Sequence, residues 1–327
     1  MLINSPFALE DDSAYRRWRD WKLNAYPTQA EALVVEIKDP RAPTEAETRE
    51  FLRVCRKTNM VIYAGRAVNT AEARQSDADK AIPRKLGAQF GLHRLDSNML
   101  ADDDGITSLR VMPEKSQRGY IPYSNKRLLW HTDGYYNPPK RRIRALVLHC
   151  VMPAAQGGEN ALLDHEIAYI KLRDANPAYI RALMAPDVLT IPANTEEGIE
   201  TRPAQTGPVF SIDPVGGNLH MRYTARTRSI EWKPDPLTQE AVHFLENLLT
   251  SDIPYIFRHR LESGQGLLCN NVLHNRTGFE DDPDKGCSRL IYRARYYDRI
   301  AGTNMGELLG RDGHALSKRD TVAAPRH

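Results

Sequence analysis

The chain has 327 residues, of which 41% are hydrophobic and 27% charged, and its formal net charge is +3. Basic and acidic residues are interspersed, so the composition gives no reason to expect a nucleic-acid partner. No apolar run reaches membrane-spanning length, and the first residues lack a basic segment followed by an apolar core. We therefore expect a cytoplasmic protein with no membrane partner.

The N-terminal part, residues 1–58, is predicted to be mainly helical. One amphipathic pattern covers residues 13–26, and a second helix runs from Thr44 to about residue 57. Thr44 and Glu47 have the spacing of a capping box. A short apolar strand at residues 60–64 and a helix at residues 82–90 follow.

The rest of the chain reads mostly as short strands with a few helices between them. Helices are predicted at residues 166–173, 178–184 and 235–249. Strands are predicted at residues 108–112, 145–152, 160–163, 209–212, 219–223, 255–258, 267–273 and 289–297. Because all-β cores with added helices commonly reach this size undivided, we predict a single domain over residues 1–327.

Two long stretches break this pattern and are predicted to be irregular. Residues 99–127 contain acidic residues, glycines and tyrosines, and residues 191–207 are rich in Pro, Thr and Glu. Loops of this length in a compact domain are often lids over a site, although simple surface excursions are the alternative. Tyr120 and Tyr123 would belong to the first lid. The polar tail, residues 302–327, is expected to be loosely ordered.

A pair of metal-ligand residue types lies at His131 and Asp133. Residues two apart on a strand project from the same face, so both side chains can reach one ion while Thr132 points away. The pair alone is weak evidence for a metal, because the ordinary interpretation is a strand-end histidine that is hydrogen-bonded to a nearby aspartate. His274, at the end of a downstream apolar strand, completes two imidazoles and one carboxylate, the facial triad typical of non-haem Fe(II) oxygenases.

The last predicted strand carries several arginines at alternate positions. Arg289, Arg293 and Arg295 would share one face with Ile291. A solvated outer face is one reading of this pattern. The other is capture of an anion inside the fold, because arginine forms paired hydrogen bonds with carboxylates.

Four motifs in order resemble the taurine dioxygenase family of Fe(II)/2-oxoglutarate-dependent dioxygenases, which includes the 2,4-dichlorophenoxyacetate dioxygenases. The resemblance extends from about residue 61 to residue 298. It implies a mainly β fold with flanking helices around a double-stranded β-helix, or jelly-roll, core. The motifs are Trp130-His131-Thr132-Asp133, Gly157-Gly158-Glu159-Asn160-Ala161, Asn270-Asn271-Val272-Leu273-His274 and Arg289-Leu290-Ile291-Tyr292-Arg293.

The resemblance implies a role for each matching residue. The triad His131, Asp133 and His274 would bind Fe(II), and Arg289 would hold the distal carboxylate of 2-oxoglutarate. Asn160 stands where the family usually has threonine, but its amide can also donate a hydrogen bond to that carboxylate. The remaining candidates would contact the substrate, and they are Arg293, Tyr135, Tyr136, Tyr123 and His93.

The implied activity is a single catalytic domain that couples O2 and 2-oxoglutarate to hydroxylation of an unactivated C–H bond, with release of succinate and CO2. Arg293 indicates an anionic substrate, whereas the tyrosines equally permit an aromatic or cationic one. Desaturation, epoxidation and ring formation stay open as outcomes. Two other classes also stay open: a metalloenzyme of this fold that does not use 2-oxoglutarate, and a non-catalytic ligand-binding protein. Homo-oligomers are common in the family.

Overall fold

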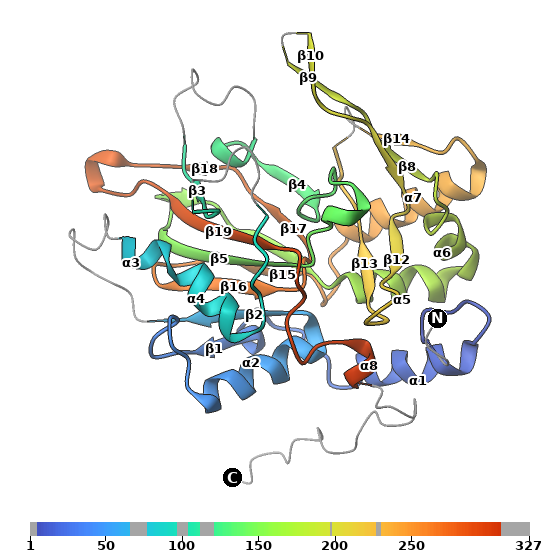
Figure 1. The fold of residues 1–327 in the computed structure, drawn as a ribbon, viewed down its shortest axis with the longest axis horizontal. Coiled ribbons are helices and arrows are strands. Elements are labelled where there is room, and N and C mark those ends of the chain that lie inside the picture. The colour runs from blue at the N-terminus through green and yellow to red at the C-terminus, as the bar shows by residue number, and fades with distance from the viewer. Residues whose placement is uncertain are drawn as a thin grey trace.

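The computed structural model describes residues 5–65, 77–96, 104–111, 121–196, 198–226 and 230–308. A large sheet of six strands and a small sheet of four strands dominate it (Figure 1). The large sheet has, from edge to edge, β1 (Val34–Glu36), β2 (Met60–Ala64), β16 (Gln265–Cys269), β5 (Ala145–Met152), β19 (Leu290–Tyr296) and β3 (Thr107–Leu109). The small sheet has β15 (Phe257–His259), β7 (Asn160–Leu163), β17 (Leu273–Arg276) and β4 (Leu128–His131).

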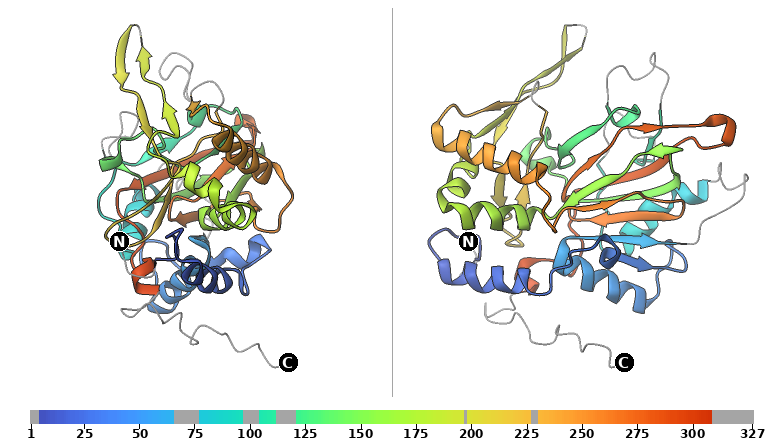
Figure 2. Two further views of the ribbon diagram at one scale, coloured as in Figure 1. Left: turned by 90° about the vertical axis from the view of Figure 1, so that its right-hand side faces the viewer. Right: turned by 180° about the vertical axis from the view of Figure 1, so that it is seen from behind.

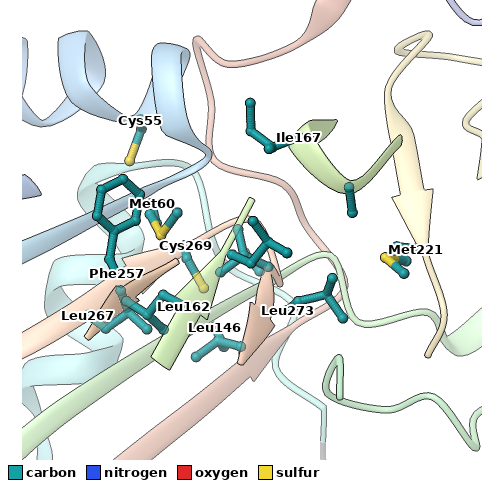
Figure 3. Close-up of a cluster of buried hydrophobic side chains, with 14 of the residues drawn as sticks. Cys55, Met60, Leu146, Leu162, Ile167, Met221, Phe257, Leu267, Cys269 and Leu273 are labelled. Carbon is teal, nitrogen blue, oxygen red and sulfur yellow. The ribbon is translucent and has the colours of Figure 1, made fainter. Parts of the chain in front are cut away.

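The two sheets share one hydrophobic core. Leu146 and Leu267 from the large sheet lie beside Leu162 and Leu273 from the small sheet, and all four are buried (Figure 3). Truncating such a residue to alanine typically costs about 2–5 kcal/mol, because the cavity left behind collapses only in part. The mainly β architecture with a jelly-roll core, predicted from the resemblance, is confirmed.

Of the two N-terminal helices, the second packs against the edge of the large sheet, whereas the first lies beside α5 (His165–Ala175), where Trp18 contacts Tyr169 (Figure 1). The two helices are α1 (Asp12–Leu23) and α2 (Glu45–Thr58), with the short 3-10 helix η1 (Ala30–Leu33) between them. The predicted capping box of α2 is present, since Thr44 accepts from the backbone of Glu47 and Glu47 accepts from that of Thr44. Strand β1, which pairs in parallel with β2, was not predicted because it is only three residues long.

A buried ion cluster joins α1 to the chain segment around residues 164–166. Lys22 Nζ lies 2.7 Å from an oxygen of Asp164 and 2.5 Å from an oxygen of Glu166. Asp164 also accepts a hydrogen bond from Asn59 Nδ2 at 3.0 Å. The Lys22 and Asp164 side chains have no exposed surface, so each charge depends on its partners for solvation.

A second group of elements lies to one side of the two sheets (Figures 1 and 2). Its helices are α5 (His165–Ala175), α6 (Pro177–Leu183) and α7 (Pro236–Thr250). One of its sheets contains β11 (Gln205–Gly207), β8 (Leu189–Ile191) and β14 (Glu231–Trp232), and a separate pair contains β12 (Phe210–Ile212) and β13 (Leu219–Met221). The remaining short elements are α3 (Asp77–Lys80), α4 (Ile82–Gln89), η3 (Ile121–Tyr123), η4 (Pro139–Arg141), β6 (Gln156–Gly157), β18 (Phe279–Glu280), η5 (Pro283–Lys285) and α8 (Met305–Leu308).

The predicted irregular stretches need two corrections. Within 191–207, β9 (Asn194–Glu196) and β10 (Ile199–Arg202) form a hairpin, and β11 follows. This hairpin projects from the fold (Figure 1), so its strands carry no alternating apolar pattern, and Gly198 adopts φ +82° at its turn. The first residues of the predicted loose tail include α8, in which Met305 is buried and its N–H donates to Asn218.

The other predicted lid is described only in part. Residues 104–111 contain β3, and the segment from residue 121 begins with η3, while Tyr120 lies outside the described residues. Residues 309–327 of the predicted tail also lie outside them. Among the helices of the described segments, none combines the length and apolar character needed to cross a membrane.

Candidate metal centre

His131 and His274 lie directly opposite each other on neighbouring antiparallel strands, β4 and β17. Their ring centroids are 4.2 Å apart. Asp133 lies two residues after His131, in the turn that follows β4 and not on the strand itself, and one ligand atom from each of the three residues lies within 4.8 Å of the others. The three residues predicted from the sequence to form one metal site therefore lie at one point in the fold.

Hydrogen bonds to the backbone prepare both imidazoles for a metal. His131 Nδ1 lies 2.9 Å from the carbonyl oxygen of Leu129, and His274 Nδ1 lies 2.8 Å from that of Val272. A carbonyl only accepts, so each Nδ1 carries the proton and each Nε2 keeps its lone pair free. This second hydrogen bond also fixes the ring orientation, as is usual for metal-binding histidines.

The charges around Asp133 keep its carboxylate ionised. Burial alone would raise the pKa of Asp133, but the Arg293 guanidinium holds it well below its ordinary value. Arg293 Nη1 lies 3.4 Å from both carboxylate oxygens. Burial and the nearby His131 lower the pKa of His274 to about 4, so this ring stays neutral. A neutral imidazole and an ionised carboxylate are the protonation states that metal binding requires.

The backbone after Asp133 is held by two features that sequence reasoning missed. The side-chain amide of Asn271 accepts from Asp133 N at 2.8 Å and donates to Asp133 O at 3.0 Å. Gly134 adopts φ +68°, and a Cβ there would lie 2.5 Å from Ile143. The only sequence signal for Asn271 was its place in the motif of His274.

A polar cavity lies beside Arg289. It is lined by Gly157, Gly158, Asn160 and Arg260 as well as Arg289. Arg289 is 7% exposed, burial lowers its pKa to about 10, and its Nη1 has no hydrogen-bond partner within the described segments. A buried cation with an unused donor fits an anionic ligand, because an unsatisfied buried donor is costly. The structure thus brings Asn160 and Arg289 together.

The two tyrosines after the triad form a wall beside it. The Tyr135 ring lies edge-on to His131, with centroids 6.4 Å apart, and packs against Tyr136 at 5.1 Å. Tyr136 Oη accepts a hydrogen bond from Arg295 at 2.9 Å. Arg295 pairs with buried Asp96, so the third arginine of the last strand is committed to the protein itself.

The other two residues predicted to contact the substrate, Tyr123 and His93, lie in different environments. Tyr123 is buried in η3, just before the turn that Arg276 of β17 holds by donating to Ser124 O at 3.0 Å. His93 is exposed, and its backbone N–H donates to Asp298. No contact among the described residues joins His93 to the triad, so its assignment stays a prediction.

Comparison with known proteins agrees with this geometry. The profile of the family described as "Taurine catabolism dioxygenase TauD, TfdA family" matches residues 73–295. A uridine-5'-phosphate dioxygenase from a Streptomyces species is 30% identical over 182 residues, which is 50% of this chain and 60% of that relative.

Solved structures share the fold at low sequence identity. An asparagine oxygenase in complex with Fe(II), 3-hydroxyasparagine and succinate superposes with a TM-score of 0.55 at 16% identity, covering 90% of this chain and 92% of that one. The non-haem iron oxygenase OrfP in complex with Fe, succinate and hydroxyarginine gives 0.56 at 18% identity, covering 90% of each chain. At these identities the likeness concerns the fold.

Proposed function

The chain belongs to the taurine catabolism dioxygenase TauD, TfdA family, and on that premise we propose that it is an Fe(II)- and 2-oxoglutarate-dependent dioxygenase of a small organic substrate. The observation that carries the proposal is the convergence of His131, Asp133 and His274 at one point, with the ring nitrogens tied to backbone carbonyls. Two imidazoles and a carboxylate leave one face of an Fe(II) ion open to other ligands.

The residues present fit the metal, and each has a defined task. His131 and His274 would bind through Nε2 and Asp133 through its carboxylate. With 2-oxoglutarate and O2, a bound Fe(II) would supply an oxidative decarboxylation in which one oxygen atom enters succinate as CO2 leaves and the other converts an unactivated C–H bond to C–OH. Arg293 neutralises Asp133 from the side, and Asn271 fixes the Asp133 backbone, so the ligand set is organised before the metal arrives.

The cavity at Arg289 suits the distal carboxylate of 2-oxoglutarate. The unused Nη1 of Arg289 is a charged donor, and Asn160 lines the same cavity. A hydrogen bond between ionised partners is worth about 1.5–3 kcal/mol, more than a neutral one. Arg289 would therefore orient the co-substrate, which leaves Tyr135 and Arg293 to face the substrate.

The substrate is proposed to be small and polar, with an anionic group recognised by Arg293. Its buried Nε has no partner among the described residues, so one donor is free once Nη1 faces Asp133. The Streptomyces relative is named for uridine-5'-phosphate, a phosphate-bearing molecule, which makes uridine 5'-phosphate a reasonable first compound to test. Cytoplasmic location, the absence of nucleic-acid and membrane partners, and a homo-oligomeric state stay predictions.

The proposal is tested by an anaerobic titration of the apo-protein with Fe(II) and 2-oxoglutarate, followed by visible absorption. A weak metal-to-ligand charge-transfer band should form, and the Arg289→Ala variant should need at least about 30-fold more 2-oxoglutarate. Arg258→Ala, which removes an exposed arginine on β15, is the matched control and should behave as wild type. Bound iron without a band would indicate a metalloenzyme that does not use 2-oxoglutarate, and no iron binding would indicate a non-catalytic protein.

A further inference from the structure

A separate cavity lies between the loop that follows β4 and the strands β11 to β13. Its volume is about 30 Å³, which is enough for more than one water molecule. Thr132 belongs to its wall, and the Thr132 backbone and hydroxyl are hydrogen-bonded to Tyr223 rather than turned to the triad. The polar side chains that line it include Arg142, His220, Arg222, Ser211, Thr206 and Gln205.

The two arginines of this cavity form no ion pair within the described ranges. Asp213 acts on Arg142 from a distance and is itself paired with Arg144 at 3.5 Å, so it compensates the charge of Arg142 only in part. Arg142 is half-buried, and its guanidinium has neither a hydrogen bond nor an ion pair with any residue in the described ranges. Arg222 donates to the carbonyl oxygens of Gln205 and Gly207, both at 3.2 Å, but its Nε is buried without a partner in the same part of the chain. Carbonyl dipoles satisfy donors but do not cancel the charge.

The other wall residues do not supply an anion. Asp133 is the one acidic residue among those that line the cavity in the described chain, and its carboxylate faces Arg293 and the two histidines. His220 adds a ring with no hydrogen-bond partner among these residues. Burial and neighbouring arginines lower the pKa of His220 well below its usual range, so it is neutral and can donate one N–H.

We propose that this cavity is a binding site for an oxyanion: phosphate, sulfate or a carboxylate, either free or as the charged end of a larger molecule. Arg142 supplies a charged fork, His220 an N–H and Ser211 a hydroxyl, which are the donors that oxyanions prefer. Partly buried cations without an ion pair are unfavourable, and a bound anion reduces that cost. Because Thr132 and Tyr135 belong to the wall, the anion would also brace the loop that carries Asp133.

The site is tested by isothermal titration with inorganic phosphate. All proteins carry Arg289→Gln, so that the cavity at Arg289 cannot act as the anion site, and the measurement needs no metal and no activity. The parent protein should bind one phosphate, and adding Arg142→Gln should weaken binding at least about tenfold, as loss of a charged hydrogen bond does. Lys140→Gln removes an exposed charge two residues away and should change affinity less than about twofold.

A second arm separates the sources of the anion. Uridine 5'-phosphate is titrated into the Fe(II) and 2-oxoglutarate complex of the wild-type chain and of Arg142→Gln. A shift of the charge-transfer band in the wild type that the variant loses would place the charged end of a substrate in the cavity. Phosphate binding without such a shift would assign a free anion. The proposal is overturned if the parent binds no phosphate up to about 50 mM, or if Arg142→Gln, or His220→Gln as a second variant, binds as tightly as Lys140→Gln.

The two proposals fail separately. Loss of phosphate binding leaves the charge-transfer band of the wild-type chain untouched, whereas a missing band leaves the phosphate titration interpretable.

Discussion

The side chain of Asn271 pairs with the backbone of Asp133 on both its N–H and its C=O side, at 2.8 and 3.0 Å. The same amide nitrogen donates to Ile143 O at 2.8 Å, so one side chain joins the segment before β17, the turn at Asp133 and the segment just before β5. Asn271 itself adopts φ +50°, a conformation that asparagine tolerates better than most residues. It is a positioning residue for the carboxylate ligand.

We expect Asn271→Gly to weaken Fe(II) binding by about 10- to 100-fold, the usual cost of losing a group that orients a metal ligand. Glycine accepts the left-handed backbone without strain, so the variant isolates the loss of the amide. Anaerobic calorimetry with Fe(II) gives the affinity. Asn271→Ala, which adds backbone strain, should lose more thermal stability than Asn271→Gly. Equal iron affinity in wild type and Asn271→Gly would show that the amide has only a structural role.

Asn160 and threonine should be interchangeable at the Arg289 cavity if a donor is all that the position supplies. We expect Asn160→Thr to bind 2-oxoglutarate within about threefold of wild type, and Asn160→Val, which has the shape of threonine without the hydroxyl, to bind about tenfold more weakly. The readout is the co-substrate concentration at half-maximal charge-transfer absorbance. If Asn160→Val matches Asn160→Thr, the side chain does not touch the carboxylate.

The buried cluster at Lys22 should dominate the attachment of α1. We expect Lys22→Met to lower the free energy of unfolding by about 3–5 kcal/mol, because Asp164 and Glu166 would keep buried charges without their cation. Arg16→Gln is the control on the same helix, since Arg16 pairs with Asp12 at 75% and 60% side-chain exposure and should cost less than about 1 kcal/mol. Urea unfolding measures both. A small loss in Lys22→Met would mean that the carboxyl groups take up protons when the lysine is removed.

Local patterns predicted much of the site, because its key residues lie on short strands or within two residues of them. The two-residue period predicted that His131 and Asp133 reach one point, and their ligand atoms do so, although Asp133 lies in the turn after β4. The single apolar strand predicted at residues 267–273 is wrong. β16 ends at Cys269 in the large sheet and β17 begins at Leu273 in the small sheet, because the chain turns between them, where Asn271 adopts φ +50°. The sequence could not reveal contacts between residues that are far apart in the chain and meet only in the folded protein. Asn271 acts on a backbone 138 residues away, and Asp96, the partner of Arg295, follows a segment with no strand signal.

The misjudged elements have the same origin. Prediction of strands relies on one buried face, and the hairpin of β9 and β10 projects from the fold without one. The cavity proposed to bind an oxyanion could not be predicted from the sequence for a related reason. Arg142, His220 and Arg222 are far apart in the chain and come together only where the loop after β4 meets β11 to β13.

His149 should give the protein an acid-sensitive stability. The residue is 3% exposed in β5, its Nδ1 lies 3.0 Å from Tyr63 Oη, and burial lowers its pKa from 6.5 to about 4. The unfolded chain takes up this proton near pH 6.5, whereas the native protein resists it until about pH 4. Stability that is fully present above pH 6.5 is therefore lost progressively as the pH falls toward 4.

The measurement is the melting temperature across this pH range for wild type, His149→Gln and His243→Gln. Glutamine keeps a hydrogen-bonding group beside Tyr63 but cannot titrate, so His149→Gln should lose less stability than wild type between pH 6.5 and 4, whatever its stability at neutral pH. His243 is exposed on α7, and its replacement should leave the wild-type slope unchanged. If the slopes of wild type and His149→Gln coincide, the ring is protonated in the native state and its burial does not control the acid limb.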